Sequence, residues 1–167
     1  KTILHSDQAI LSTQCPASVA VIGGGAVGVE FAYWYNAFGS RTTIIEIADQ
    51  LLPPTDREIA DLLAKSFKRQ GITALTSARV ESAVPGSGGV TLSVRVGDGM
   101  KTIEASMVLV AVGRAATVQG LGLEEIAGKK SWLGPLYPVK LHQMGEPFLH
   151  PDLIPIVERA ESLGVGI

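Results

Sequence analysis

The spacing of apolar residues predicts strands that alternate with helices in the first part of the chain. A continuous apolar run at 19–22, followed by three glycines, is typical of a strand buried on both faces. Residues 26–38 then follow a helical period. The apolar residues that recur at steps of three and four are Val27, Phe31, Trp34 and Phe38. Gly39 would end this helix in a left-handed conformation, and the β-branched stretch 42–47 predicts a second strand, which completes a βαβ unit with an expected right-handed crossover.

A second helix and a change of period are predicted next. Thr55 and Glu58 form a capping-box pattern at the start of a helix over 56–70, which Gly71 ends. The face of this helix that we expect to be buried consists of Ile59, Leu62, Leu63 and Phe67. The period then becomes two, which predicts an antiparallel meander inserted into the α/β domain, before a further buried strand at 107–112. The strands of the meander are expected near 72–75, 79–84, 90–96 and 101–105, with glycine-containing turns at 85–89 and 97–99.

Composition narrows the class of protein. With 167 residues the chain has material for about one domain. A formal net charge of −2 argues against a nucleic-acid surface or an anionic membrane as partner. The longest apolar run, Met107–Val112, is far below the ~18 residues that span a bilayer. The single cysteine, Cys15, excludes an intrachain disulfide, a Cys-x-x-Cys zinc site and a self-contained dithiol redox centre.

The glycine-rich segment after the first strand fits the pattern G-x-G-x-x-G of a dinucleotide-binding turn. Gly23 allows a tight turn, Gly25 lets the backbone approach a pyrophosphate, and Gly28 lets the helix pack closely on the strand. The free N–H groups at the start of the helix, around Ala26 and Val27, then face the diphosphate with the aid of the helix dipole. The alternative is a plain strand-to-helix turn.

Glu46 stands at the end of the second strand, 23 residues after Gly23, close to the expected spacing of about 20. A carboxylate there can accept hydrogen bonds from both adenosine ribose hydroxyls. A 2′-phosphate would meet like charge, and residues 47–50 contain no Arg or Lys, so the sequence favours NAD over NADP. The alternative is a solvated acid at a strand end.

Two more residues are candidates for the cofactor site. Glu30 lies in an otherwise apolar helix face, where an acid that complements the helix dipole is an equally good explanation. Gly113 ends the last buried strand, at the carboxyl edge where open α/β sheets bind ligands, although a turn glycine would serve there as well.

These motifs together resemble the NAD-binding domain of the pyridine nucleotide-disulfide oxidoreductases (flavoprotein disulfide reductases), most closely the dihydrolipoamide (dihydrolipoyl) dehydrogenases. The resemblance covers residues 1 to about 128. It is carried by 5–10, 19–32 (VAVIGGGAVGVEFA), 38–40, 43–46, 52–53, 56–59, 70–72, 108–114 (VLVAVGR) and 121–124.

The resemblance implies a Rossmann-like α/β domain that holds NAD(H) so that its nicotinamide stacks on FAD. It implies that Glu46 binds the adenosine ribose, that Glu30 lies near the nicotinamide end, and that Val80 and Gly113 flank the cofactor. It also implies a cytoplasmic oxidoreductase that is a homodimer when complete. In this family hydride passes between NAD and FAD, and no residue of the NAD-binding domain is expected to be catalytic.

The complete reductases need parts that this sequence lacks: an FAD domain with its own glycine fingerprint, a Cys-x4-Cys redox disulfide, and an interface domain with a catalytic His. One fingerprint and one cysteine are present. We therefore expect residues 1–16 to be a linker from a missing FAD domain and 17–128 to be the NAD-binding domain. The alternative function is that of an isolated, non-catalytic NAD-binding module.

Residues 129–167 are expected to form an unrelated strand–helix extension. The segment 141–153, with its Gly-Glu-Pro turn, resembles a part of the radical S-adenosylmethionine enzymes, but the Cys-x3-Cys-x2-Cys cluster motif is absent. An ordinary βα unit is the alternative, and a hybrid fragment is a further hypothesis for the whole chain. No metal site is expected from His142, Glu146 and His150, because their spacing crosses Pro147 and is not helical.

Overall fold

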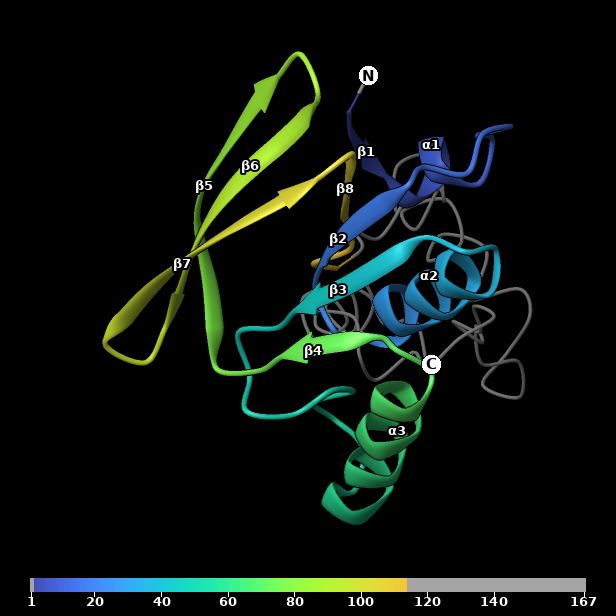
Figure 1. Cartoon of the computed structure of the whole chain (residues 1–167). Helices are drawn as coiled ribbons and strands as arrows, with labels where there is room; N and C mark the ends of the chain where they lie inside the picture. The colour runs from blue at the N-terminus through green and yellow to red at the C-terminus, as the bar shows by residue number, and fades with distance from the viewer. Residues whose placement is uncertain (1, 114–167) are drawn as a thin grey trace, which may run out of the picture. The chain divides into compact units, whose positions relative to one another are not determined.

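A sheet of five parallel strands forms the centre of the domain (Figure 1). The computed structural model describes residues 2–113, so the expected extension 129–167 and its candidate residues lie outside the described part. The sheet has the order β1-β8-β2-β3-β4, and all neighbours run parallel. Its strands are β1 (Ile3–His5), β2 (Ser18–Ile22), β3 (Arg41–Ile45), β4 (Thr73–Leu75) and β8 (Met107–Val110).

A second, antiparallel sheet of three strands is inserted between β4 and β8. Its strands are β5 (Ala78–Gly86), β6 (Gly89–Val96) and β7 (Gly99–Ala105). The predicted meander is thereby confirmed, with strands that extend further into the glycine-containing turns than the sequence indicated. The pairing of β5 with β6 shifts register between Val80 and Ser82, as at a β-bulge.

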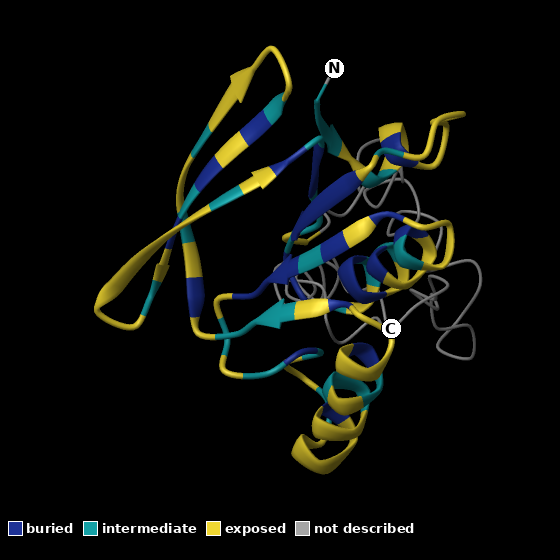
Figure 2. Cartoon of the chain, viewed as in Figure 1, coloured by how far each residue is buried: buried dark blue, intermediate teal, exposed yellow. Residues whose placement is uncertain are grey.

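The two faces of the parallel sheet are covered by different layers. Helices α1 (Ser6–Ala9), α2 (Ala26–Ala37) and α3 (Arg57–Arg69) supply one core together with the side chains of Val19 and Val21. The antiparallel sheet forms the other core against Ala20 and Ile45. Figure 2 shows the central strands as the most buried part of the fold. Because both faces are covered, the central strands β2 and β8 have continuous apolar sequences, which is why they could be predicted.

The first predicted helix is confirmed in its extent, but the residues whose spacing predicted it are not the ones it buries. Helix α2 ends before Gly39, which has a φ of +93°. The buried residues are Gly28, Val29, Ala32 and Tyr35. Trp34 and Phe38, two of the residues whose spacing predicted the helix, are 55% and 74% exposed. The helix is apolar on nearly every side, so the spacing of its large residues did not identify the side that meets the sheet.

Helix α3 also differs from its prediction at the start and on its buried face. The N-cap is Asp56, whose carboxylate accepts from the N–H of Glu58, so Thr55 does not cap this helix. Ile59 and Leu62 are more than half exposed. The residues that pack inward form a stripe of step three and four, Ala60, Leu63, Ala64 and Phe67. Two alanines in this stripe allow close approach to the sheet, and they were overlooked because larger apolar residues stood beside them.

Two segments that were not predicted as strands of the parallel sheet belong to it. Strand β4 was counted with the meander but pairs in parallel with β3. Strand β1 lies within residues 1–16, the expected linker, and pairs in parallel with β8 at the edge of the sheet. Both strands are only three residues long, and each is placed in the sheet by pairing with a strand that is distant in the sequence. Within residues 2–113, no helix combines the length and the apolar character needed to cross a membrane.

The corrected packing predicts different effects of two leucine-to-alanine substitutions. Leu92 on β6 is fully buried, so Leu92→Ala should lower the free energy of unfolding by about 2–5 kcal/mol through lost burial and a cavity. Leu62 on α3 is 56% exposed, so Leu62→Ala should change it by no more than about 0.5 kcal/mol. Urea denaturation of both variants measures these values. If both variants lost the same free energy of unfolding, Leu62 would be buried, as the sequence predicted for that face of α3.

Candidate cofactor site at the carboxyl edge of the parallel sheet

The site lies where three neighbouring parallel strands end. Strand β2 stands between β3, which follows it directly through α2, and β8, which comes much later in the chain. The connections from β2 and β8 therefore diverge at this edge. In open α/β sheets, ligands bind in the crevice that such a switch in strand order creates outside the carboxyl ends.

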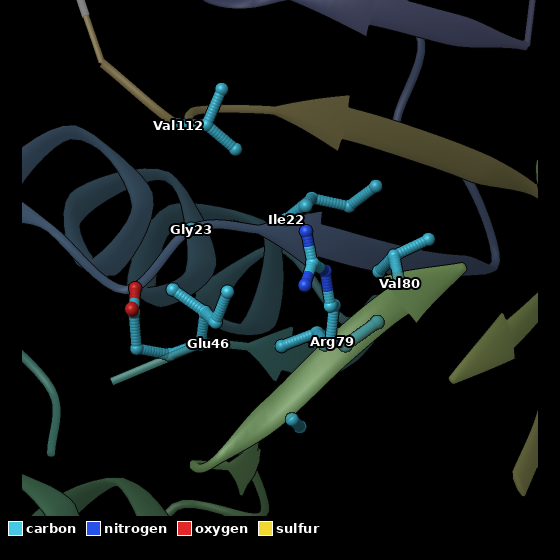
Figure 3. A pocket seen from close by; sticks show the side chains of 9 residues that line it. Ile22, Gly23, Glu46, Arg79, Val80 and Val112 are labelled. Atoms are coloured by element: carbon cyan, nitrogen blue, oxygen red, sulfur yellow. The ribbon is translucent and has the colours of Figure 1, made fainter. Parts of the chain in front are cut away.

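A pocket of about 350 Å³ is present at this edge, within the size range of small-molecule sites (Figure 3). Strand ends β2, β3 and β8 and the start of β5 contribute its walls. Its lining residues are Ile22, Gly23, Ile45, Glu46, Ile47, Ala78, Arg79, Val80 and Val112. Six of the nine are apolar, and Glu46 and Arg79 are the charged ones.

The turn after β2 can be formed only with glycine at its first position. Gly23 has a φ of +107°, and a Cβ there would lie 2.4 Å from the carbonyl oxygen of Ala111. Its N–H donates to the carbonyl oxygen of Ile45 at 2.9 Å. The tight turn expected of Gly23 is confirmed, and it joins the ends of β3 and β8.

The start of α2 packs directly onto this turn. A Cβ on Gly28 would lie 1.9 Å from the carbonyl oxygen of Gly23, so the close helix packing expected at Gly28 is confirmed. Gly24, which the motif leaves free, is restricted as well. A Cβ on Gly24 would lie 2.8 Å from Leu51 Cδ2 and 3.0 Å from Glu46 Cβ. No pattern in the sequence predicted this, because both neighbours come from a loop more than 20 residues away.

Gly25 differs from the other glycines of the turn in the space around it. Its φ is −72°, and a Cβ built there would have no atom of another part of residues 2–113 within 4 Å. Gly25 is the N-cap of α2 and offers no side chain to cap the helix. The first N–H groups of a helix, here near Ala26 and Val27, have no partner within the helix. The space over Gly25 is therefore open and faces the positive end of the helix dipole.

Glu46 is buried and held in one orientation. Its side chain is part of a residue only 6% exposed, so it is not the solvated acid that the sequence left open. One carboxylate oxygen accepts from the N–H of Gly24, and the other accepts from the N–H of Ala48 at 2.7 Å. The backbone of Glu46 is held as well: its N–H donates to the carbonyl oxygen of Leu75, and its carbonyl oxygen accepts from the N–H of Ala78. Each oxygen keeps a second lone pair that can accept from a ligand.

The other predicted residues are distributed around the pocket. Val80 lines it, as does Val112, the neighbour of Gly113. Gly113 has a φ of +142°, and among residues 2–113 no atom outside its chain neighbours lies within 4 Å of a Cβ built there. Glu30 is exposed on α2, beyond the first turn, and it does not line the pocket. Its position outside the first turn removes the main reason to regard it as an acid that complements the helix dipole.

Arg79 is the lining residue that sequence reasoning missed. The preference for NAD over NADP considered only residues 47–50, which contain no Arg or Lys. Strand β5 brings Arg79 to the same pocket from a part of the chain that follows β4. A signal for this would have required knowing that β5 begins at the carboxyl edge of the parallel sheet. Residues 2–113 contain no cluster of His, Cys, Asp and Glu suited to a metal ion.

Comparison with known proteins gives matches over most of the chain. Residues 1–132 match the family described as pyridine nucleotide-disulphide oxidoreductase. Dihydrolipoyl dehydrogenase of Chlorobaculum tepidum is 37% identical over 127 residues, 75% of this chain and 27% of that protein. Dihydrolipoyl dehydrogenase of Zymomonas mobilis is 40% identical over 115 residues, 68% of this chain and 25% of that protein. The crystal structure of LpdA from Mycobacterium tuberculosis aligns with a TM-score of 0.63 at 31% identity, over 74% of this chain and 26% of that one.

The glycine turn predicts effects of different size for two glycine-to-alanine substitutions. Gly28→Ala should lower the free energy of unfolding by about 1–3 kcal/mol or more, because its Cβ would overlap the carbonyl oxygen of Gly23. Gly25→Ala should change it by no more than about 1 kcal/mol, because the space is open and the φ suits alanine, while alanine is a poorer N-cap than glycine. Chemical denaturation measures both. If Gly28→Ala were as stable as the parent chain, the close packing described above would be wrong.

Proposed function

The chain belongs to the pyridine nucleotide-disulphide oxidoreductase family, and we propose that its residues 17–128 bind NAD(H) and hold it for hydride exchange with FAD in the complete enzyme. The family expected from the sequence is thus confirmed. The chain spans about a quarter of the length of the relatives it matches, so the activity of the whole protein is part of this proposal. The observation that carries it is the pairing of an open glycine turn with a buried, fixed carboxylate at the switch in strand order.

The two phosphates of the dinucleotide fit the start of α2. The open space over Gly25 admits a group that needs close contact with the backbone. The unpaired N–H groups of the first turn, around Ala26 and Val27, donate to phosphate oxygens, and the helix dipole adds a favourable field. Gly25 itself has no side chain that would stand between the phosphates and these N–H groups.

The adenosine ribose fits Glu46. The lone pairs that remain on its two oxygens accept from the 2′- and 3′-hydroxyls, while the N–H groups of Gly24 and Ala48 hold the carboxylate in place. A 2′-phosphate would be placed against a buried negative charge, which disfavours NADP. This contrast makes NAD(H) the preferred cofactor even though Arg79 lines the same pocket.

The nicotinamide end of the cofactor fits the side of the turn that faces β8. Gly113 follows that strand, and as a glycine it carries no side chain that would cover the nicotinamide. Glu30, one position past the first turn of α2, is exposed and available at this end of the helix. Bound NAD(H) would supply the hydride chemistry, and FAD would come from a domain that residues 2–113 do not include. The residues of this chain bind and orient the cofactor.

The proposed role of Glu46 predicts a change in cofactor preference. The chain should bind NADH more tightly than NADPH in a calorimetric titration. Glu46→Gln should weaken NADH binding about ten-fold, because a charge-assisted hydrogen bond is replaced by a neutral one, and it should narrow the difference from NADPH. Glu104→Gln, at an exposed position of β7, is the matched control and should bind as the parent does. Equal binding of NADH and NADPH by the parent chain would remove the role given to Glu46.

The proposed phosphate site predicts that bulk over Gly25 prevents binding without unfolding the protein. Gly25→Leu fills space that is open in the structure, so the free energy of unfolding should remain close to that of the parent chain. Binding of NADH should fall by at least a hundred-fold, because the side chain occupies the approach to the N–H groups of α2. A Gly25→Leu variant that takes up NADH normally would show that the phosphates lie elsewhere.

A further inference from the structure

The pocket of Figure 3 lies beside the glycine turn, on the side away from the proposed phosphate position. Gly23 contributes to its wall, whereas Gly25 and Ala26 do not. Most of the wall is apolar, from Ile22, Ile45, Ile47, Ala78, Val80 and Val112. A wall of this kind suits a flat, weakly polar group and offers little to a phosphate. Because Glu46 is also part of the wall, the group that fits is the base attached to the ribose it holds, which is adenine.

Arg79 forms no ion pair within 4 Å in the part of the chain that the structure describes. The ion pairs among residues 2–113 involve Arg57, with Asp49 and Asp61, and Arg95, with Glu81. Arg95 and, more weakly, the charge of Arg79 lower the pKa of Glu81 on the same strand as Arg79. Figure 3 shows the guanidinium of Arg79 reaching across the pocket toward Ile22, while the carboxylate of Glu46 turns away from it toward the glycine turn. Arg79 is exposed, so its guanidinium forms the solvent side of a pocket whose other walls are mostly apolar.

We propose that Arg79 stacks its guanidinium on the exposed face of the adenine ring and so closes the base into the apolar pocket. A guanidinium is planar, weakly hydrated and suited to stacking on aromatic faces, including those of nucleic-acid bases. The opposite face of the ring lies against aliphatic side chains of β2 and β3, Ile22 and Ile45. This assignment rests on the proposed function, since it takes the position of the ribose from Glu46.

A role as reader of a 2′-phosphate fits Arg79 less well. Such a phosphate would stand on the ribose carbon nearest Glu46, whose carboxylate is buried and fixed by two backbone N–H groups. The repulsion from that carboxylate would oppose the attraction of an exposed arginine, which solvent and salt weaken. Stacking on adenine involves no such conflict, because the base is uncharged.

The test uses the whole 167-residue chain and compares Arg79→Met with the parent. Methionine keeps much of the length of the side chain and removes the planar cation. Calorimetric titration with NADH and with ADP-ribose should show binding weakened about five-fold for both, because both carry adenine. Binding of reduced nicotinamide mononucleotide, which carries a phosphate but no adenine, should not change. Arg79→Lys keeps the positive charge but lacks the planar guanidinium. Its binding constant for NADH should therefore be closer to that of Arg79→Met than to that of the parent chain.

The salt dependence of binding and a matched control variant distinguish stacking on adenine from a contact with phosphate. A stacked guanidinium leaves the dependence of the binding constant on salt concentration nearly unchanged in Arg79→Met, whereas loss of a phosphate contact would make binding clearly less sensitive to salt. Arg41→Met is the control, since Arg41 is exposed at the opposite, amino end of β3 and should have no effect.

Three results would overturn the proposal: a loss confined to NADPH, a loss accompanied by the reduced sensitivity to salt, or unchanged binding of NADH and ADP-ribose by Arg79→Met. Failure of the parent chain to bind NADH would instead count against the proposed function itself. The two failures are therefore distinguishable in one set of titrations. Denaturation of each variant confirms that folding is preserved, as expected for an exposed side chain.

Discussion

The close approach of three backbone segments at the end of β2 is the constraint on which the rest of the site depends. The turn at Gly23 touches the chain that leaves β8, and the first turn of α2 rests on the same turn through Gly28. Neither position has room for a single methyl group. This contact sets where α2 begins, and it therefore sets which N–H groups point into the crevice between the strand ends.

Glu46 extends the same arrangement toward β3. Its carboxylate accepts from the turn at Gly24 and from the loop at Ala48, so the acid is positioned by the backbone that surrounds the proposed cofactor. Burial of a charged group is tolerated when hydrogen bonds compensate it, and here two are present. The acid is consequently part of the structure of the turn before any ligand binds, and a binding site of this kind loses little free energy to reorganisation.

The antiparallel sheet has two roles in the fold. Its buried residues cover the face of the parallel sheet that the helices leave open, in a core centred on Leu92 and Val94. Its first strand, β5, also starts beside the carboxyl edge and brings Arg79 and Val80 to the pocket. The same insertion thus completes the hydrophobic core and supplies one wall of the candidate site.

The sequence by itself determined the order of strands and helices from β2 onward, the glycine turn and the acid at the end of β3. Short-range patterns encode these features: apolar and β-branched runs for strands, and a fixed spacing of glycines for the turn. It did not determine the inward faces of α2 and α3, since an almost wholly apolar helix offers no contrast and small alanines were outweighed by exposed isoleucine and leucine. Nor did it reveal the restriction at Gly24, the parallel pairing of β1 and β4, or the presence of Arg79 beside Glu46. Those features arise from contacts between residues far apart in the chain, and only the folded arrangement of the two sheets decides which of them meet.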